Sequence, residues 1–180
     1  MLHGLAVVVA VMGLQVTGAS ADGTGDSLYT RVRPIERYMI GLVREGYDRS
    51  PTFRQLVDTI QRSNVTVWVA PGLCAGGRIR SCVASVSGSE QARYIWIKID
   101  PQHTIKSGLI AAIAHELQHV VEIAEHPEVT DASSVVKLYR GIAFGLCRER
   151  LSEECETAHA LDAEKAVLSE LLPKRRKAPS

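Results

Sequence analysis

The chain has 180 residues, of which 46% are hydrophobic and 23% are charged, a composition typical of a single globular domain. That length is sufficient to bury a sizeable hydrophobic core. Lys and Arg total 21 against 20 for Asp and Glu, and the resulting net charge of +1 gives no electrostatic support for nucleic acid as a partner.

The first 21 residues resemble a signal peptide. The apolar segment 5–16 is too short to span a bilayer, and Ala19 and Ala21 provide the small residues that a signal peptidase prefers. We expect cleavage after Ala21, one domain over residues 22–180, and a secreted or periplasmic protein without a stable membrane anchor. An uncleaved anchor is the alternative, because no Lys or Arg precedes the apolar segment.

All four cysteines follow this segment, and an oxidising compartment favours disulfides. We expect the two local pairings, Cys74 with Cys82 and Cys147 with Cys155, because each closes a small loop. A four-thiolate zinc site is the alternative, but seven residues separate the cysteines of each pair, which exceeds the usual ligand spacing of structural zinc.

Two helices are predicted first. Residues 28–44 carry apolar side chains at helical spacing, and Gly46 is expected to end that helix. Ser50 and Pro51 then supply an N-cap and a proline at the first helical position, which predicts a second helix to about Arg62.

Three strands follow, at residues 65–69, 78–86 and 93–100. The first is rich in β-branched residues, and the third alternates polar and apolar residues, which predicts one exposed face. We expect a mostly antiparallel sheet of about three strands.

The remaining elements are helical, so the fold class is α+β. The apolar run 105–124 predicts a largely buried helix, and Thr130 and Asp131 cap the next one. Ser152 is expected to start a last helix, which reaches about Leu172. Residues 174–180 contain a short basic run and are expected to be a disordered tail.

A metal-binding motif lies within the helix predicted at 105–124. His115 and His119 are four residues apart, so a helix places both imidazoles on one face, where they can share one Zn²⁺ ion. Glu116 lies beside them and can accept a proton from a metal-bound water. The alternative is a pair of core histidines bonded to backbone carbonyls.

A zinc site needs a third protein ligand. Glu122 and Glu125 occupy the positions where the extended metzincin signature requires Gly and His, so that signature is absent. On the last predicted helix, Glu156 is surrounded by small residues and shares a face with His159. Glu156 is the preferred third ligand, with Glu164 or His159 as the alternatives.

With these motifs the chain resembles gluzincins, the zincin metallopeptidases in which a glutamate from a later helix joins a His-Glu-x-x-His helix. It also resembles short exported bacterial proteins with a His-Glu-Leu-Gln-His helix and a later Glu-Thr-x-x-Ala segment, here residues 115–119 and 156–160. The resemblance covers roughly residues 94–172 and implies a small zincin-like domain. Many gluzincins orient a ligand histidine with an Asp four residues after the ligand Glu. That position is Ala160 here, and Glu122 or His159 could take the role.

The predicted function is an exported zinc-dependent peptidase that acts on peptide or protein substrates as a monomer. His115, His119 and Glu156 would hold zinc, and Glu116 would be the general base. His159 or Tyr139 would stabilise the oxyanion. The strand at 93–100 would accept an extended peptide by strand addition.

Two other functions fit the same residues. One is a non-catalytic exported binding or envelope protein that retains the zincin scaffold. The other is a metal-dependent hydrolase acting on a non-peptide amide.

Overall fold

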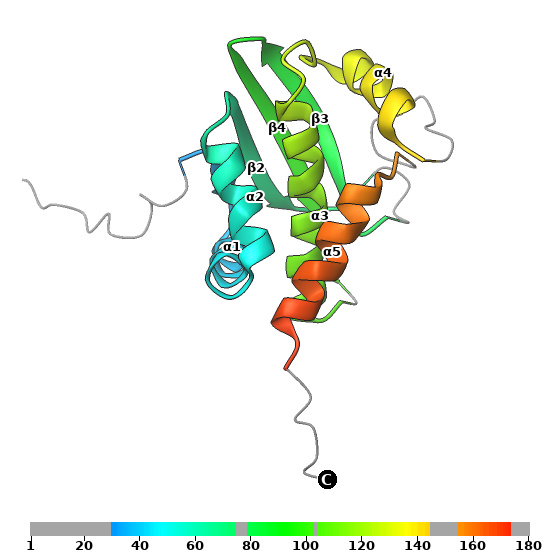
Figure 1. Ribbon diagram of the computed structural model, residues 1–180. Helices are drawn as coiled ribbons and strands as arrows, with labels where there is room; N and C mark the ends of the chain where they lie inside the picture. Colours follow the sequence, from blue (N-terminus) through cyan, green and yellow to red (C-terminus); the bar gives the residue numbers. More distant parts are fainter. Residues whose placement is uncertain (1–29, 75–78, 103, 145–154, 174–180) are drawn as a thin grey trace, which may run out of the picture.

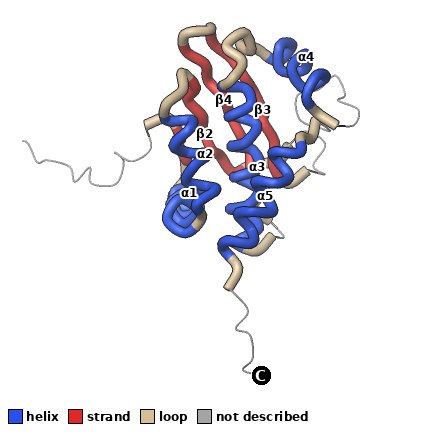
Figure 2. The backbone as a smooth tube through the Cα atoms, in the orientation of Figure 1, coloured by secondary structure: helices blue, strands red, loops and turns tan. Residues whose placement is uncertain are grey.

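The computed structural model describes residues 30–74, 79–102, 104–144 and 155–173. Over these residues the chain is α+β, with five helices and a four-stranded mixed sheet. The elements are β1 (Val32–Pro34), α1 (Arg37–Arg49), α2 (Pro51–Gln61), β2 (Val65–Pro71), β3 (Ser81–Ser89), β4 (Ala92–Ile99), α3 (Lys106–Ala124), α4 (Ala132–Ile142) and α5 (Ala158–Leu171). The helices gather on one side of the sheet, with α3 running across its middle (Figures 1 and 2).

The strand order is β1-β2-β4-β3, with β1–β2 and β2–β4 parallel and β3–β4 antiparallel. The predicted three-stranded, mostly antiparallel sheet is therefore wrong in both strand number and strand direction. β2 pairs in parallel with β4, which is not the next strand in the sequence, and β3 is left at an edge of the sheet. The three predicted strands themselves exist, with shifted ends.

The hydrophobic core lies between the sheet and the helices. Alternate residues of the two central strands are fully buried, namely Val65, Val67, Val69, Ile95, Ile97 and Ile99. The opposite face of β4 is partly exposed, as its alternation predicts, with Tyr94 at 43% and Trp96 at 39%. Trp68 stacks on Trp96 across that face, with ring centroids 5.3 Å apart.

The first predicted helix is only partly correct. Its first half contains β1, in which buried Val32 is paired with Val67 of β2. Pro34 disfavours helix in the residue before it, so an extended start is physically reasonable. Gly46 does not end α1, which continues to Arg49. A Cβ atom at Gly46 would lie 2.8 Å from Phe53 and 2.9 Å from Ile110, so this glycine allows close packing with α2 and α3.

The corner between α1 and α2 is held by buried Ser50, which N-caps α2 as predicted. Its hydroxyl accepts a hydrogen bond from the Phe53 amide at 3.0 Å and donates one to Glu170 of α5. Arg49 also donates to the Leu171 carbonyl at 2.8 Å. These contacts tie the C-terminal end of α5 to the first two helices.

The far end of α3 is held by Arg93 of β4, which is 1% exposed. Its guanidinium donates to the carbonyls of Ile123, Ala124 and His126 at 2.6–3.0 Å, and to the Asn64 side chain. A cation at the C-terminal end of a helix also interacts favourably with the helix dipole. Arg93 therefore fixes α3 against the sheet.

Cys74 and Cys82 form the predicted disulfide. No helix in the described part of the chain is long and apolar enough to cross a membrane. The predicted signal peptide at residues 1–21, Cys147 of the second predicted disulfide, and the predicted tail at 174–180 lie outside the described residues.

Candidate metal centre

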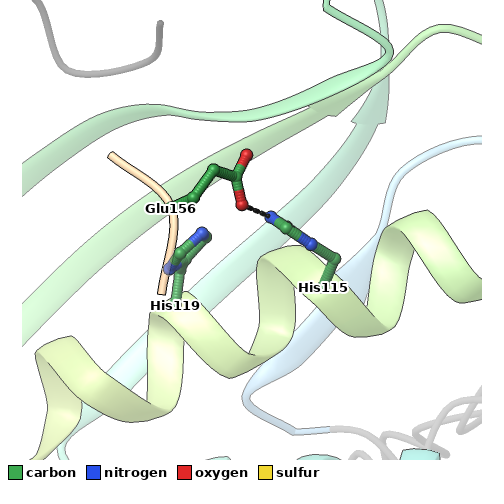
Figure 3. A group of neighbouring side chains, drawn as sticks. All are labelled: His115, His119 and Glu156. Atoms are coloured by element: carbon green, nitrogen blue, oxygen red, sulfur yellow. Dashed lines mark ion pairs between the residues drawn. The ribbon is translucent and has the colours of Figure 1, made fainter. Parts of the chain in front are cut away.

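Helix α3 carries the two histidines of the motif in its buried central part. As predicted, the helix is almost entirely buried, and His115 and His119 are only 7% and 6% exposed. Their ring centroids are 4.9 Å apart with an interplanar angle of 79°. The i, i+4 spacing therefore places both imidazoles on the same side of α3 (Figure 3).

Glu156 reaches these histidines from a short segment before α5 (Figure 3). Its Oε2 atom lies 3.2 Å from Nε2 of His115. Glu156 was predicted to lie in a helix starting at Ser152 and to share a face with His159, but α5 begins at Ala158, so that prediction is wrong. Thr157 N-caps α5, and its hydroxyl accepts from the Ala160 amide at 3.1 Å. Glu156 itself forms an isolated β-bridge with Phe144.

His115, His119 and Glu156 form a group that could hold a metal ion, because their ligand atoms all lie within 4.8 Å of one another. Two ligands bound tetrahedrally at about 2.1 Å are roughly 3.4 Å apart. The separation of 3.2 Å between His115 and Glu156 already matches that value.

Two buried atoms at the same place have ion-pair partners but no hydrogen bond. Among the described residues, Nδ1 of His115 and Oε2 of Glu156 are the buried side-chain atoms that make no hydrogen bond. Buried polar atoms are costly without a partner. Oε2 of Glu156 has the His115 ring as an ion-pair partner at 3.2 Å, and a bound metal cation would take that place, so the residues present fit a metal ion.

The ring nitrogens that face away from this group lie close to carboxylates. His119 Nδ1 is 2.9 Å from Oε2 of Glu122, and His115 Nδ1 is 3.3 Å from Oε2 of Glu164. Carboxylates in such positions orient metal-binding histidines. Glu122 therefore occupies the place expected of an orienting residue, while Glu164, an alternative third ligand in the sequence analysis, lies behind His115.

The carboxylates dominate the electrostatics of His115. Burial lowers the pKa of His115, but Glu156 and Glu164 raise it more, to about 10 from the ordinary 6.5. His115 in turn lowers the pKa of both carboxyl groups. Burial raises the pKa of Glu122, but its hydrogen bonds with His119 and Thr157 outweigh burial, so the net shift is downward. In the metal-free protein, His115 is thus an imidazolium held between two carboxylates.

Glu116 is also buried on α3, at 3% exposure. Burial raises the pKa of Glu116, although the two histidines and a hydrogen bond with Ser81 of β3 oppose this shift. A carboxylate with a raised pKa is a stronger base. Glu116 therefore lies beside the histidines in an environment suited to accepting a proton.

Of the two residues predicted to stabilise the oxyanion, Tyr139 is buried beside His119 and His159 is exposed. Tyr139 of α4 is buried, with its ring edge-on to His119 and its hydroxyl 3.3 Å from the His119 carbonyl oxygen. Burial raises the pKa of Tyr139 well above its ordinary value, so the hydroxyl stays protonated. His159 is exposed near the start of α5 and is not a member of the metal-binding group.

Two residues at the site were not singled out by the sequence analysis. Ser81 contacts Glu116, and Thr157 links the segment that carries Glu156 to Glu122. Thr157 could have been found, because a threonine directly before an alanine-rich helical run is a typical N-cap. No sequence pattern pointed to Ser81, because its contact with Glu116 depends on where β3 lies in the sheet.

Comparisons of the chain with protein families, with curated proteins and with solved structures find no match.

Proposed function

We propose that the protein is an exported, zinc-dependent peptidase with a zincin-like arrangement of sheet, metal helix and third ligand. The observation that carries the proposal is the convergence of His115, His119 and Glu156 around one point beside buried Glu116. Export is supported by the disulfide between Cys74 and Cys82, which an oxidising compartment favours.

Zn²⁺ suits this group because two imidazoles and one carboxylate are a common ligand set for catalytic zinc. His119 would bind through Nε2, since its Nδ1 contacts Glu122, and His115 through the Nε2 atom that faces Glu156. A zinc ion there would polarise the scissile carbonyl and lower the pKa of a bound water.

Glu116 would accept the proton of the attacking water and then deliver it to the leaving amine. Its burial favours this shuttle, because the neutral form is stabilised and the proton is not lost to bulk water. Ser81 would hold the carboxyl group in place. Tyr139 contacts the back of His119 and is better placed to position that residue than to contact substrate.

The substrate is expected along β3 rather than β4. Strand addition to β4, as the sequence analysis predicted, is excluded because β4 is paired with β2 on one side and β3 on the other. Within the described sheet, β3 has a strand partner on one side only, and its first residue, Ser81, contacts Glu116. An extended peptide added to this edge would run past the metal group.

The test is turnover of a mixed peptide library by wild-type protein and by Glu116→Gln, with zinc content measured in the same samples. We expect the variant to retain about one zinc per chain and to lose roughly 10²–10⁴-fold in turnover, as removal of a general base does. Loss of zinc in Glu116→Gln would make Glu116 structural and contradict the mechanism. Bound zinc without turnover in the wild type would favour the non-catalytic binding protein, and cleavage of non-peptide amides alone would favour the other hydrolase.

A further inference from the structure

Glu122 is an unusual residue for its position. It lies in the last turn of α3, where the helix dipole disfavours a negative charge, and it is only 5% exposed. A buried carboxylate of this kind requires hydrogen-bonding partners. Both of its oxygens have one: Oε2 contacts His119 Nδ1 at 2.9 Å, and Oε1 accepts a hydrogen bond from the Thr157 hydroxyl at 2.6 Å. The Tyr139 hydroxyl also hydrogen-bonds the Glu122 carboxylate.

The Thr157 hydroxyl is held in one orientation by two hydrogen bonds. Its hydroxyl oxygen accepts from the Ala160 amide as the N-cap of α5, and its hydroxyl hydrogen is donated to Glu122. Thr157 is 3% exposed and follows Glu156 directly in sequence. The same hydroxyl therefore caps the N-terminus of α5 and bonds this end of α5 to α3. Both bonds hold the backbone next to Glu156 in place.

The chain of contacts Thr157–Glu122–His119 joins ligands from different elements. It orients His119 on α3 and, through Thr157, holds the backbone next to Glu156. The contact behind His115 is weaker, because Glu164 is 32% exposed and His115 Nδ1 makes no hydrogen bond. Four residues after Glu156, where many gluzincins carry an Asp that orients a histidine, this chain has Ala160, which cannot do so.

We propose that Thr157 is a positioning residue of the metal centre: through Glu122, its hydroxyl fixes the relative placement of His119 and Glu156 and so sets the affinity for zinc. This inference rests on the proposed metal site. The residues that orient His119 are then Glu122, on the same helix α3, and Thr157, at the start of α5.

The protein contains a matched control. Ser50 is also a buried N-cap hydroxyl that donates to a glutamate, Glu170, but it lies at the corner of α1 and α2, outside the metal-binding group. Ser50→Ala and Thr157→Val each remove one cap and one hydrogen bond to a carboxylate. They should lower the melting temperature of the metal-free protein by similar amounts.

Zinc affinity, measured by competition with a chelating indicator, should separate the two variants. We expect Thr157→Val to bind zinc about 10–100-fold more weakly than wild type, in the range known for orienting residues, and Ser50→Ala to bind like wild type. Thr157→Ser should restore most of the affinity. Glu122→Gln should be weakened similarly, and the double variant should lose little more, because both residues act through one chain of contacts.

Wild-type affinity in Thr157→Val would overturn this inference while leaving the proposed metal site intact. Equal weakening in Thr157→Val and Ser50→Ala would show a purely structural cap and would also overturn it. Absence of zinc from the wild type itself would remove the proposed function and the inference together. If Thr157→Val does not fold, wild-type affinity in Glu122→Gln decides against the inference.

Discussion

His115 has a carboxylate near each of its ring nitrogens, Glu156 at 3.2 Å and Glu164 at 3.3 Å. These two negative charges hold a proton on the ring, with a pKa of about 10. Zinc binds only the neutral imidazole, so binding below that pH must displace the proton. In the metal-free protein, the protonated form stabilises the fold fully below pH 6.5, and this contribution is lost as the pH rises toward 10.

Zinc binding should therefore release about one proton at pH 8, and the apparent affinity should rise about tenfold per pH unit between pH 7 and 9. Calorimetry in buffers of different ionisation enthalpy measures that release. Glu164→Gln should release fewer protons, because it removes one of the two charges that raise the pKa of His115. Proton release that is absent in the wild type at pH 8 would mean that His115 is neutral there.

At the scale of an element, α3 depends on Arg93 for its C-terminal end. The buried guanidinium satisfies the carbonyls of Ile123, Ala124 and His126, and no lysine can reproduce its planar set of donors. The periodicity of residues 105–124 predicted the helix and its burial correctly, because apolar spacing along one segment is a local signal. The contribution of Arg93 was not predictable, since it depends on where β4 lies beneath α3.

Arg93→Lys is expected to lower the free energy of unfolding by about 3 kcal/mol or more, because buried carbonyls lose their donors. Urea unfolding provides the measurement. Arg54→Lys is the control, because exposed Arg54 makes the same kind of contact with the Tyr47 and Asp48 carbonyls in the last turn of α1. We expect a loss below about 1 kcal/mol for that variant. Equal losses in the two variants would show that burial of Arg93 is unimportant.

At the scale of the whole molecule, the sequence predicted most individual helices and strands, but it did not predict how the strands pair in the sheet. The helix that carries residues 115–119, the N-cap at Ser50 and the disulfide between Cys74 and Cys82 were predicted from local spacing, and the structure agrees with each. The parallel pairing of β2 with β4 could not be predicted, because β3 lies between them in the sequence. Strand pairing depends on how side chains of different strands pack together, which the pattern within one strand does not reveal.

Glu156 was predicted correctly as a residue of the site, but its local structure was not. It was selected from a supposed helical face shared with His159, and α5 does not extend to it. It nevertheless reaches His115, because residues 155–157 lie beside α3, where Thr157 is bonded to Glu122. The residue was predicted correctly as a member of the group, and the reason given for it was wrong.

The central claim is that His115, His119 and Glu156 bind one zinc ion. Elemental mass spectrometry of the purified protein tests it most directly, beside His119→Ala and the control His126→Ala, which removes a histidine paired with Glu128 outside the group. We predict about one zinc per chain in the wild type and in His126→Ala, and little in His119→Ala. Protein that contains no metal, even after zinc is added back, would contradict the claim and make both histidines of α3 core residues.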